Sequence, residues 1–212
     1  MRRNPEKITV VDHPLVAARL SILRAKTTPP AVFRRQLQEL AILLFTEASR
    51  GWTTTPIEIE TPLAPCSGVI LARPIVLIPI LRAGLGMLDG ILRVVPDAAV
   101  GHIGLSRDPE TLRPCSYYSR LPAITADAAV LILDPMLATG HSACEAVAIT
   151  KAQGARHIQF LCVLGSPPGV QQFHHSHPDV PIFTAAVDPE LSQRGYIVPG
   201  LGDAGDRYFG TD

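Results

Sequence analysis

The sequence predicts an α/β protein whose parallel sheet is flanked by helices. Strand-like and helix-like segments alternate from about residue 74 onward, the pattern of parallel strands connected by helices. The chain has 212 residues, 47% of them hydrophobic, which is enough to bury a substantial core. We find no internal repeat, low-complexity tract or composition shift that would indicate a linker. Residues 1–212 are therefore expected to form a single domain.

In the first half of the chain, helical spacing and buried runs locate the elements. A helix is expected after Pro29 and Pro30, because apolar residues recur there at helical spacing until Gly51: Phe33, Leu37, Leu40 and Leu44. Residues 57–71 have no strong periodicity and are interpreted as short strands or turns. Residues 75–80 form an apolar run typical of a buried strand. A helix should follow and end at Pro96, because one of its faces is apolar: Leu85, Leu88, Leu92 and Val95.

The second half repeats this alternation. Apolar runs predict four strands, at residues 98–105, 128–133, 158–164 and 181–187. Helices are expected over residues 142–153, with Gly154 as the stop, and after Ser166, which suits a helix start. Residues 106–122 are polar and indicate a long loop or hairpin. The glycine-rich segment after residue 195 contains aromatic residues, so we expect an ordered loop packed on the body.

Composition and charge exclude several classes of function. The formal net charge is zero, which argues against a nucleic-acid or membrane-binding surface. The first ten residues lack a secretory apolar run, and no stretch approaches the ~18 residues that span a bilayer. A soluble, cytoplasmic protein is expected. Its four scattered cysteines suggest free thiols: Cys66, Cys115, Cys144 and Cys162.

Two groups of charged or titratable residues are interpreted as solvated surface. His174, His175 and His177 fall close together late in a short predicted helix, without an acidic or cysteine partner nearby in sequence. A solvated helix end explains them better than a metal site. Arg34 and Arg35 are likewise expected on an exposed helix face.

The segment with the clearest chemical signal is residues 130–142. A hydrophobic strand ends at Asp134, and a short Thr139–Gly140 loop then opens a helix. Such a loop presents unpaired N–H groups and the positive end of the helix to an anion, at the sheet edge where ligands of parallel sheets lie. The pattern is neither a Walker loop nor a dinucleotide fingerprint. From these residues alone, an ordinary strand-to-helix turn with Asp134 and Thr139 as caps remains open.

Five segments resemble the uracil branch of the type I phosphoribosyltransferase family. They are residues 134–140, 79–87, Arg107 with 110–112, 195–206 and 13–16, so the resemblance covers nearly the whole chain. It implies a parallel sheet flanked by helices with a small hood over the active site. It also implies the reaction of uracil with 5-phosphoribosyl 1-pyrophosphate to give UMP and pyrophosphate, a step of pyrimidine salvage.

The same resemblance implies roles for individual residues. The expected catalytic residues are Arg82, Arg107, Asp134 and Asp203. The expected substrate contacts form a phosphate loop and a base loop: Asp134, Pro135, Met136, Leu137, Ala138, Thr139, Gly140, His141, Ser142, Ile197, Gly202, Asp203 and Ala204. Magnesium is expected to arrive with the donor and to meet Asp203 indirectly. Arg82 also has a physical argument, because its planar fork of donors suits a diphosphate.

Two positions depart from the family pattern. His141 stands where a second glycine is common, which would cost about 1 to 3 kcal/mol of strain if the position needs a positive φ. Ser106 precedes Arg107 where an aromatic residue is usual. Both departures affect the expected rate and donor affinity more than the reaction class.

Several alternatives remain open from the sequence. They are a sister enzyme that acts on another base, a non-catalytic regulator that binds RNA, and a generic nucleotide-binding module. The run of residues 196–206 favours uracil, and the zero net charge disfavours RNA. The resemblance implies at least a homodimer. Some relatives are regulated by a purine nucleotide such as GTP, which this sequence neither supports nor opposes.

Overall fold

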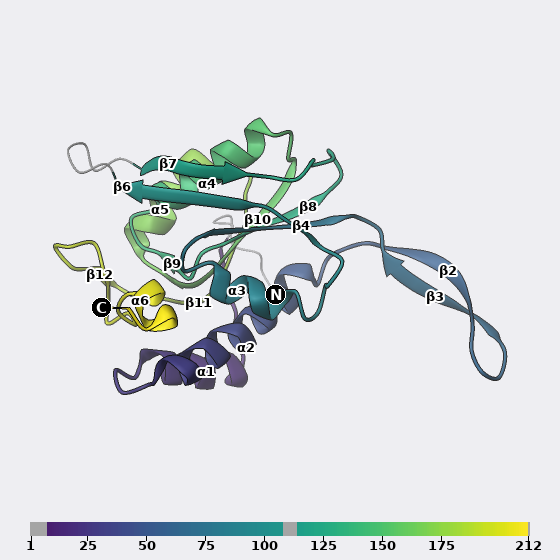
Figure 1. Cartoon of the computed structure of the whole chain (residues 1–212), viewed down its shortest axis with the longest axis horizontal. Coiled ribbons are helices and arrows are strands. Elements are labelled where there is room, and N and C mark those ends of the chain that lie inside the picture. Colours follow the sequence, from purple (N-terminus) through teal and green to yellow (C-terminus); the bar gives the residue numbers. More distant parts are fainter. Residues whose placement is uncertain (1–7, 108–113, 212) are drawn as a thin grey trace.

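A computed structural model describes residues 8–107 and 114–211, and its centre is a mainly parallel sheet (Figure 1). Within the described residues the sheet has nine strands in the order β1-β11-β10-β8-β4-β6-β7, with β5 beside β4 and β9 beside β10. Their bounds are β1 Ile8–Val10, β4 Ile75–Leu81, β5 Ala99–Val100, β6 His102–Arg107, β7 Pro114–Arg120, β8 Ala129–Leu133, β9 Met136–Leu137, β10 His157–Gly165 and β11 Ile182–Val187. Only the β6–β7 pair is antiparallel among these described strands.

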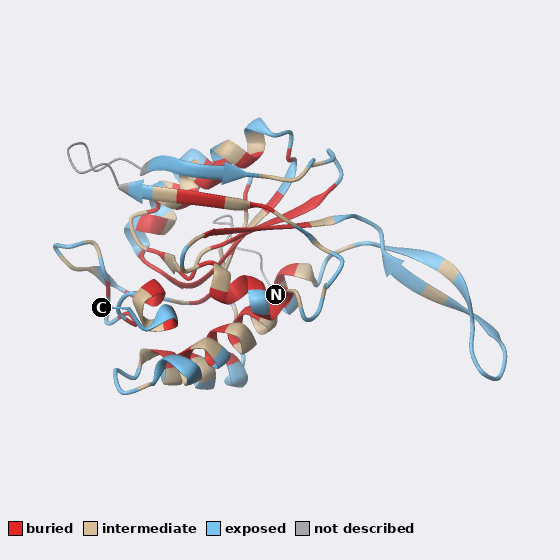
Figure 2. Ribbon diagram, in the orientation of Figure 1, coloured by how far each residue is buried: buried red, intermediate tan, exposed pale blue. Residues whose placement is uncertain are grey.

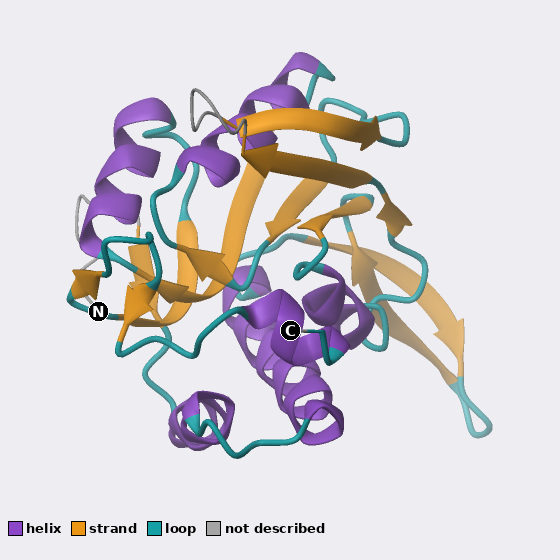
Figure 3. Cartoon of the chain, turned by 60° about the vertical axis from the view of Figure 1, so that its left-hand side comes forward, coloured by secondary structure: helices purple, strands orange, loops and turns teal. Residues whose placement is uncertain are grey.

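Helices cover both faces of this sheet (Figure 3). Their bounds are α1 Pro14–Arg24, α2 Pro30–Ser49, α3 Leu85–Ile91, α4 His141–Ala152, α5 Pro167–Ser176 and α6 Ala204–Phe209. Successive strand residues point to opposite faces, so each central strand contributes to two cores. Leu131 and Leu133 pack with α1, α2 and α3, whereas Val130 and Ile132 pack with α4 and α5. Because both faces are buried, the strands read as continuous apolar runs.

A two-stranded arm projects from the body (Figures 1 and 2). It pairs β2 Thr54–Glu60 with β3 Pro65–Leu71 in antiparallel register, and almost all of its residues are exposed. Several of the exposed side chains are large and apolar: Ile59, Leu63, Val69, Ile70 and Leu71. The arm therefore exposes an apolar surface outside the body of the protein.

The expected α/β architecture is confirmed. The strand expected at residues 98–105 is divided into β5 and β6, and the helix expected to end at Pro96 ends at Ile91. The segment of residues 106–122 takes the hairpin alternative, as β6 and β7, with residues 108–113 outside the described part. The expectation for residues 57–71 was too modest, since they belong to one long hairpin. The sequence did not predict β1, α1, β9, α6 or the two-residue strands at residues 190–191 and 197–198. No helix in the described ranges combines the length and apolar character needed to cross a membrane.

The histidine interpretation was partly wrong. His175 is exposed, but His177 is only 9% exposed, because its ring packs on Phe173 between α4 and α5. Its Nε2 donates to the Cys144 carbonyl oxygen at 3.0 Å. Among the described residues, no group of three potential ligands could hold a metal ion.

The arginine pair also divides. Arg35 is exposed as expected, but Arg34 is half-buried and donates to the Tyr208 carbonyl oxygen at 2.9 Å. The predicted helix face was therefore only half right, because α6 packs on α2 and its last carbonyl groups need donors.

Candidate active site

Two neighbouring strands bring the predicted phosphate-binding segments together. β4 and β8 are parallel and adjacent, with Pro79 opposite Leu133. Arg82 and Asp134 therefore follow the carboxyl ends of adjacent strands at the same edge of the sheet. Gly84 packs the two turns backbone to backbone, since a Cβ there would lie 2.4 Å from the Leu133 carbonyl oxygen. Only glycine fits that close approach.

The phosphate loop leads from β9 into α4. Gly140 is the N-cap residue, with φ 83°, a conformation that glycine adopts without strain. His141 is the first helical residue, so the positive φ falls one position earlier and the strain considered for His141 does not arise. Its Nδ1 lies 3.2 Å from the Thr139 Oγ1. No side chain of the described residues caps α4, which leaves its first N–H groups available to an anion.

The start of α5 supports this loop from behind. The buried Ser166 hydroxyl donates to the Ala138 carbonyl oxygen at 2.6 Å and accepts from the Gly169 N–H at 3.1 Å. A Cβ on Gly169 would lie 2.2 Å from the Ala138 carbonyl oxygen. The loop therefore rests directly on the first turn of α5.

The carboxyl-terminal segment forms the hood. β12 Glu190–Leu191 pairs with β13 Ile197–Val198, and α6 follows. Gly200 and Gly202 both have a positive φ, at 60° and 78°. The Asp203 carboxylate caps α6 by accepting from the Asp206 N–H at 2.9 Å. The expected ordered loop thus contains a short helix that packs on the body.

A cleft of about 230 Å³ lies between the phosphate loop and the hood. Its lining joins segments far apart in sequence: Ala83, Asp134, Met136, Ala138, Gly195, Tyr196, Ile197, Gly202, Asp203, Ala204 and Gly205. A larger cleft of about 310 Å³, around Trp52 and Arg156, lies at the amino ends of β8 and β10 and contains none of the predicted residues. Ligands of parallel sheets bind at the carboxyl ends of strands, which favours the smaller cleft as the active site.

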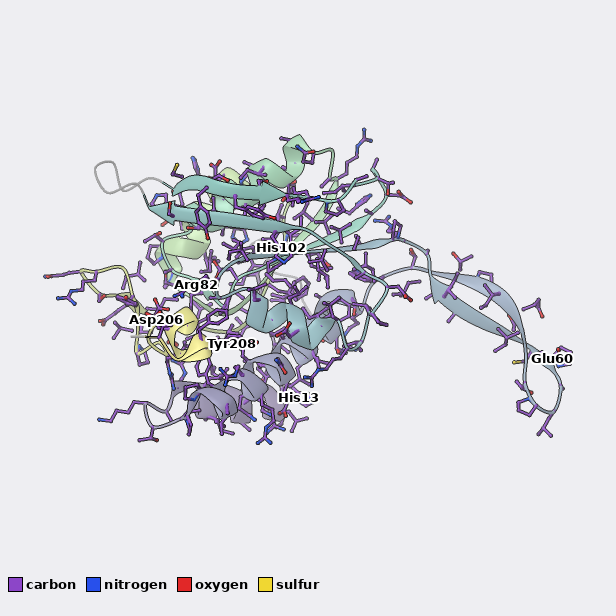
Figure 4. The ribbon with its side chains drawn as sticks, viewed as in Figure 1. His13, Glu60, Arg82, His102, Asp206 and Tyr208 are labelled. Carbon is purple, nitrogen blue, oxygen red and sulfur yellow. The ribbon has the colours of Figure 1, made fainter. Side chains whose placement is uncertain are left out.

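Arg82 lies beside this cleft, on the turn after β4, and faces α6 (Figure 4). Its Nη2 donates to the Asp206 Oδ1 at 3.0 Å, and its guanidinium lies 5.5 Å from the centre of the Phe209 ring. The Arg82 side chain is 56% exposed. Exposed ion pairs contribute little stability, so the Arg82 guanidinium can leave Asp206 at small cost.

Comparisons with known proteins agree with this geometry. A model of the uracil phosphoribosyltransferase family matches residues 10–211. The chain belongs to the uracil phosphoribosyltransferase family. The uracil phosphoribosyltransferase of Paracoccus denitrificans (strain Pd 1222) is 53% identical over 205 residues, covering 96% of this chain and 97% of the relative. That of Dictyoglomus thermophilum is 50% identical, with 96% and 99% covered.

Solved structures support the same fold. The structure of the AQ2163 protein from Aquifex aeolicus superposes with a TM-score of 0.91 at 37% identity, covering 95% of this chain and 97% of that one. Adenine phosphoribosyl transferase from Trypanosoma brucei gives a TM-score of 0.59 at 16% identity, with 92% and 89% covered. The second likeness concerns the fold alone. The predicted type I phosphoribosyltransferase architecture is confirmed.

Apart from Arg82, the predicted site residues of this family member fall into three groups. Seven line the cleft: Asp134, Met136, Ala138, Ile197, Gly202, Asp203 and Ala204. Thr139, Gly140, His141 and Ser142 continue the loop into α4, while the side chains of Pro135 and Leu137 are buried. Arg107 ends β6, but its side chain lies outside the described residues, as do residues 110–112. Four residues that were not predicted also line the cleft: Ala83, Gly195, Tyr196 and Gly205. They lie within the family-like segments 79–87 and 195–206, and that position was the signal that could have identified them.

Asp134 has the most perturbed carboxylate in the cleft. Burial and, to a smaller extent, the negative charge of Asp203 together raise the pKa of Asp134 to about 7, although the Met136 N–H opposes the shift. That N–H lies 3.5 Å from the Asp134 Oδ1. A carboxylate that is costly to ionise in the free cleft gains most from hydroxyl donors or a nearby cation.

The donor set fits a magnesium ion that arrives with its ligand. Asp134 and Asp203 face one cleft and repel each other, but the described residues offer no protein cage of three ligands. Mg²⁺ keeps several waters and binds through one or two carboxylates together with phosphates. These residues could therefore hold Mg²⁺ only in company with a phosphate ligand.

Proposed function

We propose that this chain transfers the phosphoribosyl group of 5-phosphoribosyl 1-pyrophosphate to uracil, forming UMP and pyrophosphate in pyrimidine salvage. One observation carries the proposal. The cleft joins a phosphate loop with an acidic residue at its base, residues 134–138, to a glycine-rich backbone turn, residues 195–205. A sugar phosphate suits the first surface and a flat base with alternating donors and acceptors suits the second.

The residues divide the work of the reaction. The N–H groups at the start of α4 bind the 5′-phosphate, and the Asp134 carboxylate accepts hydrogen bonds from the ribose hydroxyl groups. As the bond between C1 and the pyrophosphate oxygen breaks, negative charge collects on the leaving group, where Arg82 binds it. The N1 atom of uracil then bonds to C1 and releases its proton to solvent, while pyrophosphate departs. Asp203 would hold Mg²⁺ indirectly, together with the donor's phosphates, and the ion would offset the charge of the diphosphate.

The base loop reads uracil through its main chain. Gly202 carries no side chain, so its peptide groups can approach the base edge, between the buried Ile197 and Ala204. Uracil presents carbonyl acceptors on either side of an N–H donor, which backbone N–H and C=O groups can match. A base that presents a donor where uracil has an acceptor, or the reverse, would leave backbone N–H or C=O groups of the loop without a hydrogen bond.

The direct test is UMP formation from uracil, donor and Mg²⁺. We expect uracil to react and cytosine, adenine and hypoxanthine to react at least about 100-fold more slowly. Arg82→Ala should lower kcat by about 10²-fold or more, and Arg93→Ala, an exposed arginine after α3, should not. If the protein forms no UMP, or forms it at the same rate without uracil, the proposal is refuted. Full activity of Arg82→Ala would remove Arg82 from its proposed role. Removal of Mg²⁺ with a chelator should abolish the reaction.

Further properties of the protein belong to the same proposal. The exposed apolar arm of residues 54–71 supports a homodimer or higher homo-oligomer, in which the arm packs on a second copy. The exposed free thiols of Cys66 and Cys115 suit a reducing compartment, in keeping with a cytoplasmic enzyme. Activation by GTP stays a prediction of the resemblance, tested by measuring UMP formation with and without GTP.

A further inference from the structure

An ion pair between Arg24 and the buried Asp188 holds the turn at Gly200 in the base loop. Asp188, the first residue after β11, is 5% exposed. Its two carboxylate oxygens accept from the two terminal nitrogens of Arg24, Nη1 to Oδ2 and Nη2 to Oδ1, each at 2.6 Å. Arg24 is the last residue of α1. This two-pronged geometry is the strongest form of an arginine–carboxylate contact.

The same ion pair holds both peptide groups of Gly200. The Gly200 N–H donates to the Asp188 Oδ2 at 2.9 Å, and the Gly200 carbonyl oxygen accepts from the Arg24 Nη1 at 2.9 Å. Gly200 is buried and has φ 60°. A Cβ there would lie 2.0 Å from the Ile197 carbonyl oxygen, so the turn is closed tightly on itself. Fixing Gly200 therefore fixes the direction of the chain at both Ile197 and Gly202.

A second arginine ties the next residue to the end of α1. Arg207 donates through Nη1 to the Leu201 and Leu23 carbonyl oxygens, the former at 2.7 Å, and through Nη2 to the Ala25 carbonyl oxygen at 2.7 Å. A cation at the carboxyl end of a helix satisfies its free carbonyl groups. α1, β11 and the base loop are thereby joined into one unit.

We propose that Arg24 and Asp188 are positioning residues that determine the affinity for the base without touching it. This inference rests on the proposed function of the cleft. Neither residue lines the cleft, and both act through Gly200. The phosphate loop has its own support from Ser166 and Gly169 in α5. Loss of the pair should therefore weaken binding of uracil and spare binding of the donor.

The charge state of the pair suits this role. The hydrogen bond from Arg24 lowers the pKa of Asp188, and the Gly200 N–H lowers it further, whereas burial opposes the shift. Asp188 is consequently ionised throughout the neutral range. When one member of such a pair is removed, the other is left buried and uncompensated, so the turn it holds must rearrange.

The test compares kinetic constants for the two substrates in the full-length protein. Asp188→Asn keeps the volume but loses the charge, and Arg24→Lys keeps the charge but loses the planar fork. Each should raise the KM for uracil about tenfold, with the KM for the donor and kcat changed less than about twofold. Asp179→Asn, which removes an exposed ion pair with Lys151, is the matched control and should change neither KM.

The outcomes separate the inference from the proposed function. If the wild type makes UMP but the variants raise both KM values equally, or leave the KM for uracil unchanged, the positioning role is refuted while the function stands. If the wild type makes no UMP, the proposed function fails and the inference with it. Should Asp188→Asn unfold, judged by its thermal midpoint, the conservative Arg24→Lys variant decides the question.

Discussion

Substituting Gly169 by alanine tests whether the position of the phosphate loop depends on its close packing against α5. The added methyl group would lie 2.2 Å from the Ala138 carbonyl oxygen and 2.6 Å from that of Leu137, where ordinary contacts begin at 3.4 Å. The difference, 3.4 − 2.2 = 1.2 Å, is the distance by which the loop or the helix must yield. Both opposing atoms belong to the backbone, so no side-chain rotation can relieve the overlap.

A displacement of this size should be costly for catalysis. Misplacement of a positioned group by about 1 Å can lower the rate about 100-fold. We therefore expect Gly169→Ala to lower kcat/KM for the donor about 100-fold and to destabilise the fold by about 1 to 3 kcal/mol, as overpacking does. The base loop is supported separately, so the KM for uracil at saturating donor should change little.

The assay is steady-state UMP formation with each substrate varied in turn, accompanied by thermal unfolding. Gly51→Ala is the matched control, because a Cβ there would meet no atom within 4 Å. It should leave both the kinetic constants and the thermal midpoint unchanged. Wild-type kcat/KM for the donor in a folded Gly169→Ala protein would refute the claim that α5 positions the loop.

Three further predictions concern other residues of the structure. Ser166→Ala should raise the KM for the donor about tenfold by freeing the Ala138 carbonyl, and an unchanged KM in initial-rate assays would contradict this. Because the pKa of Asp134 is raised from 3.8 to about 7, the folded protein binds a proton that the unfolded chain releases. The free energy of unfolding should therefore fall as pH rises from ~4 to ~7. Donor affinity, measured by calorimetry, should weaken as pH falls below about 7, because the ribose hydroxyl groups bind the ionised carboxylate. Asp134→Asn should abolish both trends. If the proposed oligomer forms through the arm, Val69→Lys should convert it to a monomer in analytical ultracentrifugation, whereas Val94→Lys, at a comparably exposed valine, should not.

The central fold could be predicted because its signals are local. The apolar runs of β4 and β8 follow from burial on both faces of the sheet. Gly154, which has a positive φ, ends the helix before it. The phosphate loop was predictable for the same reason, since a strand, an acidic residue and a Thr-Gly turn are contiguous in sequence.

The elements that were missed or only partly predicted lack such periodic signals. β2 and β3 are exposed on both faces, so no alternation of apolar and polar residues indicates a strand. α6 is short and lies among glycines, although Asp203 as its N-cap and Gly210 as its stop, with φ 71°, were available signals. His177 was misjudged because its burial depends on Phe173 and Cys144 from two helices.

Long-range polar contacts were beyond prediction from the sequence. Arg24 and Asp188 are 164 residues apart, and neither belongs to a motif that suggested a role. Their pairing requires that α1 and β11 meet at the base loop, which follows only from the assembled fold. Residues that position a site through the backbone are consequently harder to foresee than the residues that line it.

The most direct test of this account is a crystal structure of the protein with bound UMP. We predict that the 5′-phosphate lies against the N–H groups of residues 138–142, with the ribose hydroxyl groups on Asp134 and the uracil ring against residues 197–204. A nucleotide bound elsewhere, such as in the larger cleft around Trp52 and Arg156, with residues 134–142 free of ligand, would contradict the assignment of the active site.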